Sequence, residues 1–229
     1  HDLELLIDTP EEISVQLNRA RIRRVKTALY SHWHPDHTAG IRVWEANYNN
    51  NGHMFELPAV VTTTEVYLAH NVARTFEEHH ALKTKCEYLQ RFQAIHVNVI
   101  PDGGTIQLDG VSITPVVLTE SYACAFLFVW RDGDQERRAL VAIDETFQWI
   151  PPAWVGHLDL FIVPAGVFEF NPLTGERLIP ADHPIMARET TLAKTLDMLK
   201  HVDAARVVFV HLNESDRLSH DDYKRLARL

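Results

Sequence analysis

The sequence predicts an α/β protein in which two mixed β-sheets are covered by helices. Short apolar runs that resemble strands alternate with helical stretches along the chain. In the middle of the chain, runs with period-2 alternation flank turn signals such as Asp109-Gly110. Nearer the end, a clear amphipathic helix lies between two apolar runs. Hairpins followed by strand–helix alternation favour mixed sheets with helical layers.

The first elements lead directly into a cluster of histidines. Residues 3–7 predict a strand, and residues 11–20 predict a helix with Thr9 as its N-cap and Pro10 at its first position. Residues 25–30 predict a second strand, and the cluster follows it without a linker.

The later elements follow from the same patterns. We expect a strand at residues 59–62 and a helical stretch that starts at Thr64. The polar region 74–92 predicts a helical insertion, which could cover the histidine cluster. We expect further strands at 95–100, 105–108, 111–118, 123–130, 138–143, 158–163 and 206–210, and an amphipathic helix at 186–202.

Composition limits the classes of function. The 229 residues suit a single domain, 1–229, and the formal net charge of −9 disfavours binding of long nucleic acid. A small anionic substrate remains compatible, because a bound cation can invert the local field. Cys86 and Cys124 form no C-x-x-C pair, which fits a reducing cytoplasm. No run is long and apolar enough to suggest a membrane span, and no signal peptide is visible.

The run His32-Trp33-His34-Pro35-Asp36-His37 is the strongest chemical signal. Residues two apart in an extended chain point to the same face, so His32 and His34 can hold one ion. Pro35 stops the strand, and Asp36 and His37 on the following turn can serve a second ion. Imidazoles with a carboxylate suit zinc, manganese or iron. The alternative is a histidine-rich loop that arose by coincidence.

This motif resembles the signature of the metallo-β-lactamase superfamily, and the order of other residues agrees with it. Asp8 follows the first strand, Asp144 ends the run Val141-Ala142-Ile143, and His211 ends the run 207–210. The arrangement is most similar to the phosphodiesterase branch, including the cyclic phosphodiesterase of the carbon–phosphorus lyase pathway. The resemblance implies a four-layer αβ/βα sandwich and, by comparison with that family, a chain that lacks its first hairpin and last strand.

The resemblance also implies a ligand set for two divalent ions. His32, His34 and Glu120 would hold one ion, Asp36, His37 and His211 the other, and Asp144 would bridge them. Glu120 stands in Leu118-Thr119-Glu120-Ser121, where the family has a histidine. A carboxylate can ligate zinc or manganese, or the change could weaken that site. Homodimers are common in the family, so a homodimer is a further expectation.

Each remaining candidate has a structural alternative. Asp36 and His183 are the candidate catalytic groups, with His183 expected to contact the substrate phosphate or protonate the leaving group, unless it is only a loop residue before a helix. Asp8 is expected to orient the cluster through hydrogen bonds, and otherwise to be a turn carboxylate. Asp144 and His211 would otherwise be strand-end residues. For His79 and Arg177 we favour a solvated surface over a role in the site.

The function expected from these residues is hydrolysis of a small phosphodiester, a cyclic one included, by metal-activated water. Hydrolysis of another bond, such as a lactone or thioester, is the first alternative, because the loops around the metals decide the substrate. A metal-binding or sensing protein that no longer turns over is the second, because Glu120 departs from the family pattern.

Overall fold

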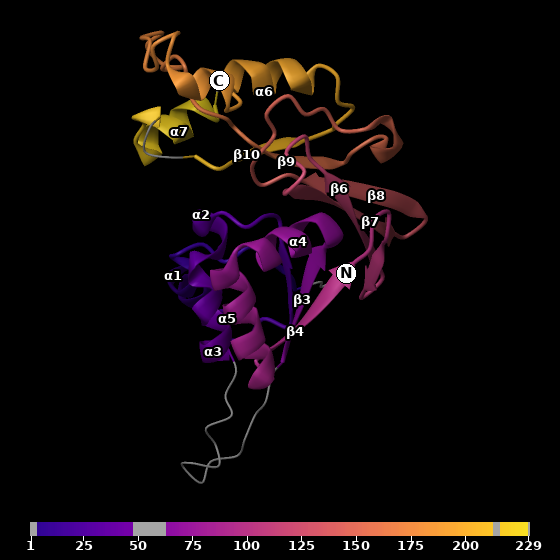
Figure 1. Cartoon of the computed structure of the whole chain (residues 1–229). Helices are drawn as coiled ribbons and strands as arrows, with labels where there is room; N and C mark the ends of the chain where they lie inside the picture. The colour runs from indigo at the N-terminus through magenta and orange to yellow at the C-terminus, as the bar shows by residue number, and fades with distance from the viewer. Residues whose placement is uncertain (1–3, 48–62, 213–215, 229) are drawn as a thin grey trace. The chain divides into compact units, whose positions relative to one another are not determined.

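The computed structural model describes residues 4–47, 63–212 and 216–228 (Figure 1). Internal contacts divide the chain into two compact units, one of residues 1–117 and 121–126 and one of residues 118–120 and 127–229. Two sheets with flanking helices confirm the α/β class predicted from the sequence. Among the described helices, none has the length and apolar character needed to cross a bilayer.

The first unit contains a parallel sheet whose strands follow one another in the order β1-β2-β3-β4. Leu29 and Val66 on its central strands are almost completely buried. Helices α4 and α5 pack against β3 and β4, as Figure 1 shows. The elements of this sheet and its connections are β1 (Leu6–Ile7), α1 (Ile13–Ala20), β2 (Thr27–Tyr30), α2 (Pro35–Thr38), η1 (Ala39–Arg42), α3 (Val43–Asn47), β3 (Thr64–Ala69), α4 (His70–Glu78), α5 (His80–Arg91) and β4 (Ile95–Ile100).

A hairpin of β5 (Ile106–Leu108) and β6 (Val111–Val117) follows in the same unit. Its turn residues Asp109 and Gly110 both have positive φ, 48° and 81°. Two positive φ values are the requirement of a type I′ turn, which Asp-Gly pairs satisfy at low cost. The hairpin predicted from this dipeptide is therefore confirmed.

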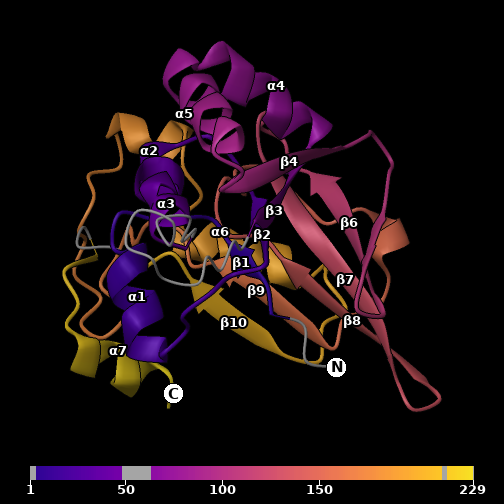
Figure 2. The same ribbon diagram turned by 90° about the horizontal axis from the view of Figure 1, so that it is seen from below.

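The second unit is built around parallel strand pairs. β8 (Gln135–Val141) pairs with β9 (Leu160–Pro164), and β9 pairs with β10 (Val207–Val210), side by side in Figure 2. β7 (Cys124–Asp132) comes before β8 in the chain; its first residues belong to the first unit and the rest to the second. The helical elements of the second unit are η3 (Ala153–Val155), η4 (Pro184–Ala187), α6 (Leu192–Leu199) and α7 (His220–Leu226).

Three expected helix boundaries are wrong. The hydroxyl of Thr9 bonds the Tyr30 hydroxyl at 2.8 Å, so α1 begins later, after Glu12 and without a side-chain cap. Thr64 begins the strand β3 and not a helix, because alternate side chains of this segment are buried in the parallel sheet. Helix α6 begins only after Thr191, whose Oγ1 accepts from the Lys194 amide at 3.3 Å. The strand expected at 59–62 lies outside the described residues.

Candidate metal centre

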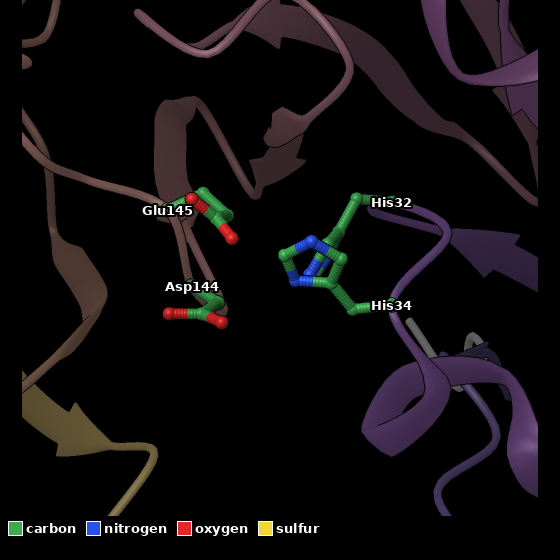
Figure 3. A group of neighbouring side chains, drawn as sticks. All are labelled: His32, His34, Asp144 and Glu145. Carbon is green, nitrogen blue, oxygen red and sulfur yellow. The ribbon is translucent and has the colours of Figure 1, made fainter. Parts of the chain in front are cut away.

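The histidine cluster begins in the turn after β2 and continues into α2. His32 and His37 are buried, 1% and 4% exposed, while Asp36 is exposed. The His32 ring centroid lies 4.6 Å from that of His34 and 4.1 Å from that of His37. Figure 3 shows the rings of His32 and His34 next to each other. Pro35 occupies the first helical position, where the fixed φ of proline favours helix initiation.

A second pair of donors lies on that turn. Nε2 of His37 is 3.2 Å from Oδ2 of Asp36, and helix α2 carries both residues. The sequence therefore brings together, within the first unit, one imidazole pair and one imidazole–carboxylate pair. These are the pairs that the spacing of the motif predicts.

Asp8 directly follows β1 and contacts the cluster; its φ is 61°. Its Oδ1 accepts from the Ser31 amide at 2.7 Å, and its Oδ2 accepts from the Ser31 hydroxyl at 2.6 Å. The same Oδ2 lies 2.8 Å from Nδ1 of His37. Ser31 Oγ in turn lies 3.0 Å from Nδ1 of His32. The carboxylate thus contacts one histidine directly and another through a hydroxyl.

Aromatic rings lie close to the cluster. Trp33 stacks on His79, with centroids 3.6 Å apart and planes 19° apart, at the junction of α4 and α5. Tyr122 lies 5.4 Å from His34, centroid to centroid. The solvated role favoured for His79 is therefore wrong, because its ring packs against a residue of the motif. Sequence spacing could not show this contact, since it joins distant segments.

The second unit carries its own donors at the carboxyl ends of its strands. Asp144 follows β8 and His211 follows β10, and His211 Nε2 lies 3.3 Å from Asp144 Oδ2. A carboxylate oxygen of Glu145 lies within 4.8 Å of one of Asp144, and Figure 3 shows these two carboxylates beside each other. Glu145 is not among the ligands predicted from the sequence, although a second carboxylate directly after Asp144 was a visible signal.

Two other predicted residues have less definite surroundings. Glu120 is half-buried, and among the described residues it joins no group of three or more potential ligands. His183 is exposed just before η4, and its Nδ1 accepts from the Ile185 amide at 3.3 Å. Arg177 pairs with Glu169 at 2.6 Å, in keeping with a structural role on the surface.

The chemistry of these donors fits divalent transition metals. Imidazole nitrogens combined with carboxylate oxygens suit zinc, manganese and iron, whereas calcium and magnesium sites use oxygen almost exclusively. Neutral imidazole is the form that binds a metal.

Comparison with known proteins agrees with this chemistry. Residues 4–212 match the model of the beta-lactamase superfamily domain. No curated protein matches the chain. Among solved structures, the fold is similar to a diphosphatase of the PhnP family (TM-score 0.62, 18% identity, 96% of this chain and 72% of that one). It is also similar to YhfI of Bacillus subtilis, with a TM-score of 0.63, 15% identity, and coverage of 100% of this chain and 81% of that one. Yeast PDE1 has a TM-score of 0.50 and 11% identity, with 90% of this chain and 64% of that one covered.

YhfI is itself described as a metallo-beta-lactamase fold protein. The domain match covers nearly the whole chain and includes Asp8, the histidine motif, Asp144 and His211. The chain therefore belongs to the metallo-β-lactamase superfamily, as the motif predicted.

Proposed function

We propose that this protein is a metal-dependent hydrolase that cleaves a small phosphodiester with two divalent ions. The observation that carries the proposal is the set of donor pairs at the strand ends, His32 with His34, Asp36 with His37, and Asp144 with His211. The diphosphatase among the similar structures supports a phosphate-containing substrate.

In the proposed ligand set, His32, His34 and Glu120 would hold one ion, and Asp36, His37 and His211 would hold the other. Asp144 would be shared by both, since a carboxylate has one oxygen for each ion. Its position beside His211 supports this role. Two bound ions supply a water that ionises near neutral pH and a field that stabilises charge developing on phosphorus oxygens.

The proton for the leaving oxygen would come from His183. Because its Nδ1 accepts a hydrogen bond from the Ile185 amide, a neutral His183 ring carries its proton on Nε2. The ring is exposed, so Nε2 can turn toward a bound substrate. To act as a general acid, His183 would bind a second proton at Nδ1 and give up the Ile185 hydrogen bond, and the imidazolium would then donate its Nε2 proton to the leaving oxygen.

Metal content and hydrolysis together test the proposal. Metal-free protein is reconstituted with Zn²⁺ or Mn²⁺, its metal is counted by elemental analysis, and hydrolysis of bis(p-nitrophenyl) phosphate is measured alongside lactone and thioester substrates. We expect two equivalents of metal and cleavage of the phosphodiester alone. Less than one equivalent would contradict the two-metal site, and cleavage of only a lactone or thioester would contradict the substrate class.

The departure at Glu120 supports a second candidate, a protein that binds metal without turnover. Exchange of Glu120 for the family's histidine separates the two. A large gain in phosphodiesterase activity in Glu120→His would favour a degenerate site, and a loss would make glutamate the functional ligand.

A further inference from the structure

We propose that Asp8 sets the tautomers of His32 and His37 together, acting directly on His37 and through the Ser31 hydroxyl on His32. Ser31 would then be a positioning residue for one of the proposed ions. All of these residues belong to the first unit. Only the consequence for metal affinity rests on the proposed function.

The hydrogen positions follow from counting donors. The Ser31 hydroxyl has one proton, and the contact of 2.6 Å with Asp8 Oδ2 assigns that proton to the carboxylate, because charge-assisted O–H···O⁻ bonds are this short. Ser31 Oγ therefore has only a lone pair to offer His32 Nδ1, which lies 3.0 Å away, and it accepts in this contact. Nδ1 of His32 must carry a proton, which leaves the lone pair of the neutral ring on Nε2.

The same count applies to His37. An ionised carboxylate only accepts, so Nδ1 of His37 donates to Asp8 Oδ2 across 2.8 Å. In the neutral ring, the lone pair is therefore also on Nε2, the atom that lies 3.2 Å from Oδ2 of Asp36. One carboxylate thus prepares an imidazole of each proposed ion, and only His32 depends on the hydroxyl between them.

Burial makes this arrangement hard to replace. Asp8 is 4% exposed and Ser31 is 2% exposed. The Ser31 amide holds the other oxygen, Oδ1, at 2.7 Å, so the carboxylate keeps its position when only the hydroxyl is removed. Ser31→Ala therefore removes the acceptor of His32 and leaves that of His37 unchanged.

Asp8→Asn has a different consequence. The backbone N–H of Ser31 requires the amide oxygen at the place of Oδ1, which puts the NH₂ group at the place of Oδ2. That NH₂ would donate to His37 Nδ1 and to Ser31 Oγ, and the Ser31 proton would then turn toward His32. Both histidines would carry their proton on Nε2, where it blocks metal binding. Asparagine also tolerates the left-handed backbone of this position.

The test reads the tautomers by ¹⁵N NMR of the histidine rings in metal-free protein at about pH 8, where ordinary imidazoles are neutral. We expect Nδ1–H rings for His32 and His37 in the wild type. Ser31→Ala should shift His32 alone, and Asp8→Asn should shift both. Thr9→Val is the matched control, because it removes a buried hydroxyl that bonds Tyr30 and touches neither imidazole.

Metal affinity supplies the second measurement. In chelator competition, Ser31→Ala should weaken the affinity of one of two Zn²⁺ binding steps roughly 10- to 100-fold, and Asp8→Asn should weaken both. Ser31→Thr keeps the hydroxyl and should therefore keep the wild-type affinity. An unchanged His32 tautomer in Ser31→Ala would overturn the inference, and so would equal changes in Zn²⁺ affinity in Ser31→Ala and Thr9→Val. Neither outcome depends on whether Ser31→Thr folds. Because the tautomers are measured without metal, failure here is distinct from failure of the proposed hydrolase.

Discussion

His211 Nε2 lies 3.3 Å from Asp144 Oδ2, although the two residues come from the ends of different strands, β10 and β8. Both strands pair in parallel with β9, so their carboxyl ends meet at one edge of the sheet. Asp144 also lies beside Glu145. A carboxylate close to two other potential ligands is suited to serve two ions, and this leads to the first prediction.

Asp144→Asn should reduce the bound metal by about two equivalents, whereas His211→Ala should remove about one. The amide has only one oxygen and no charge, so it cannot bridge two cations, while His211 is proposed to serve a single ion. Elemental analysis after reconstitution measures both variants. Equal losses in the two variants would argue against a bridging aspartate.

The second prediction concerns which carboxylate replaces the family's missing histidine. If Glu120 is the ligand, Glu120→Gln should lower Zn²⁺ affinity at one step by at least about tenfold, the scale of a lost charged ligand. Glu145→Gln is the matched variant, since Glu145 lies within ligand distance of Asp144. Competition with a chromogenic chelator compares them. A loss confined to Glu145→Gln would assign the ligand to Glu145 and remove Glu120 from the site.

The third prediction concerns stability at alkaline pH. Burial raises the pKa of the Cys86 thiol from 9.0 to about 11. A raised thiol pKa stabilises the fold fully below pH 9.0, and this contribution is lost as the pH rises to about 11. Two pKa units correspond to about 3 kcal/mol.

Denaturant unfolding across that range measures the effect. The free energy of unfolding of the wild type should fall more steeply between about pH 9 and 11 than that of Cys86→Ala, which has no thiol to ionise. Cys86→Ala should also be less stable near neutral pH by about 1 kcal/mol, because a buried sulfur leaves a small cavity. Parallel pH profiles for the two proteins would show that the thiol has the same pKa in the folded and unfolded states.

Local patterns predicted the elements that local forces determine. Alternating hydrophobicity and the Asp109-Gly110 pair indicated the β5–β6 hairpin, because the turn chemistry and the strand period agree there. The helix cap expected at Thr9 failed because a tertiary partner, the Tyr30 hydroxyl, takes that side chain. A contact between distant segments has no signal in the spacing of either one.

In the candidate site, too, residues close in sequence could be predicted and contacts between distant segments could not. The motif from His32 to His37 was visible because its donors are close in sequence. The link from Asp8 through Ser31 depends on the parallel pairing of β1 and β2, which places residues of the two strand ends together. Glu145 was not predicted because the family pattern indicates position 120 for the remaining ligand.

The last prediction tests the general acid. If His183 protonates the leaving oxygen, His183→Ala should lower kcat strongly for an alkyl phosphodiester, whose leaving group needs a proton, by roughly 10²- to 10⁴-fold. For bis(p-nitrophenyl) phosphate the loss should be much smaller, because p-nitrophenolate leaves without protonation. His157→Ala is the matched control, because His157 is an exposed histidine that pairs with Asp203 and is not a proposed ligand. A rise in KM with unchanged kcat, or an equal fall in kcat for both substrates, would make His183 a binding residue. Only proton donation depends on the basicity of the leaving group.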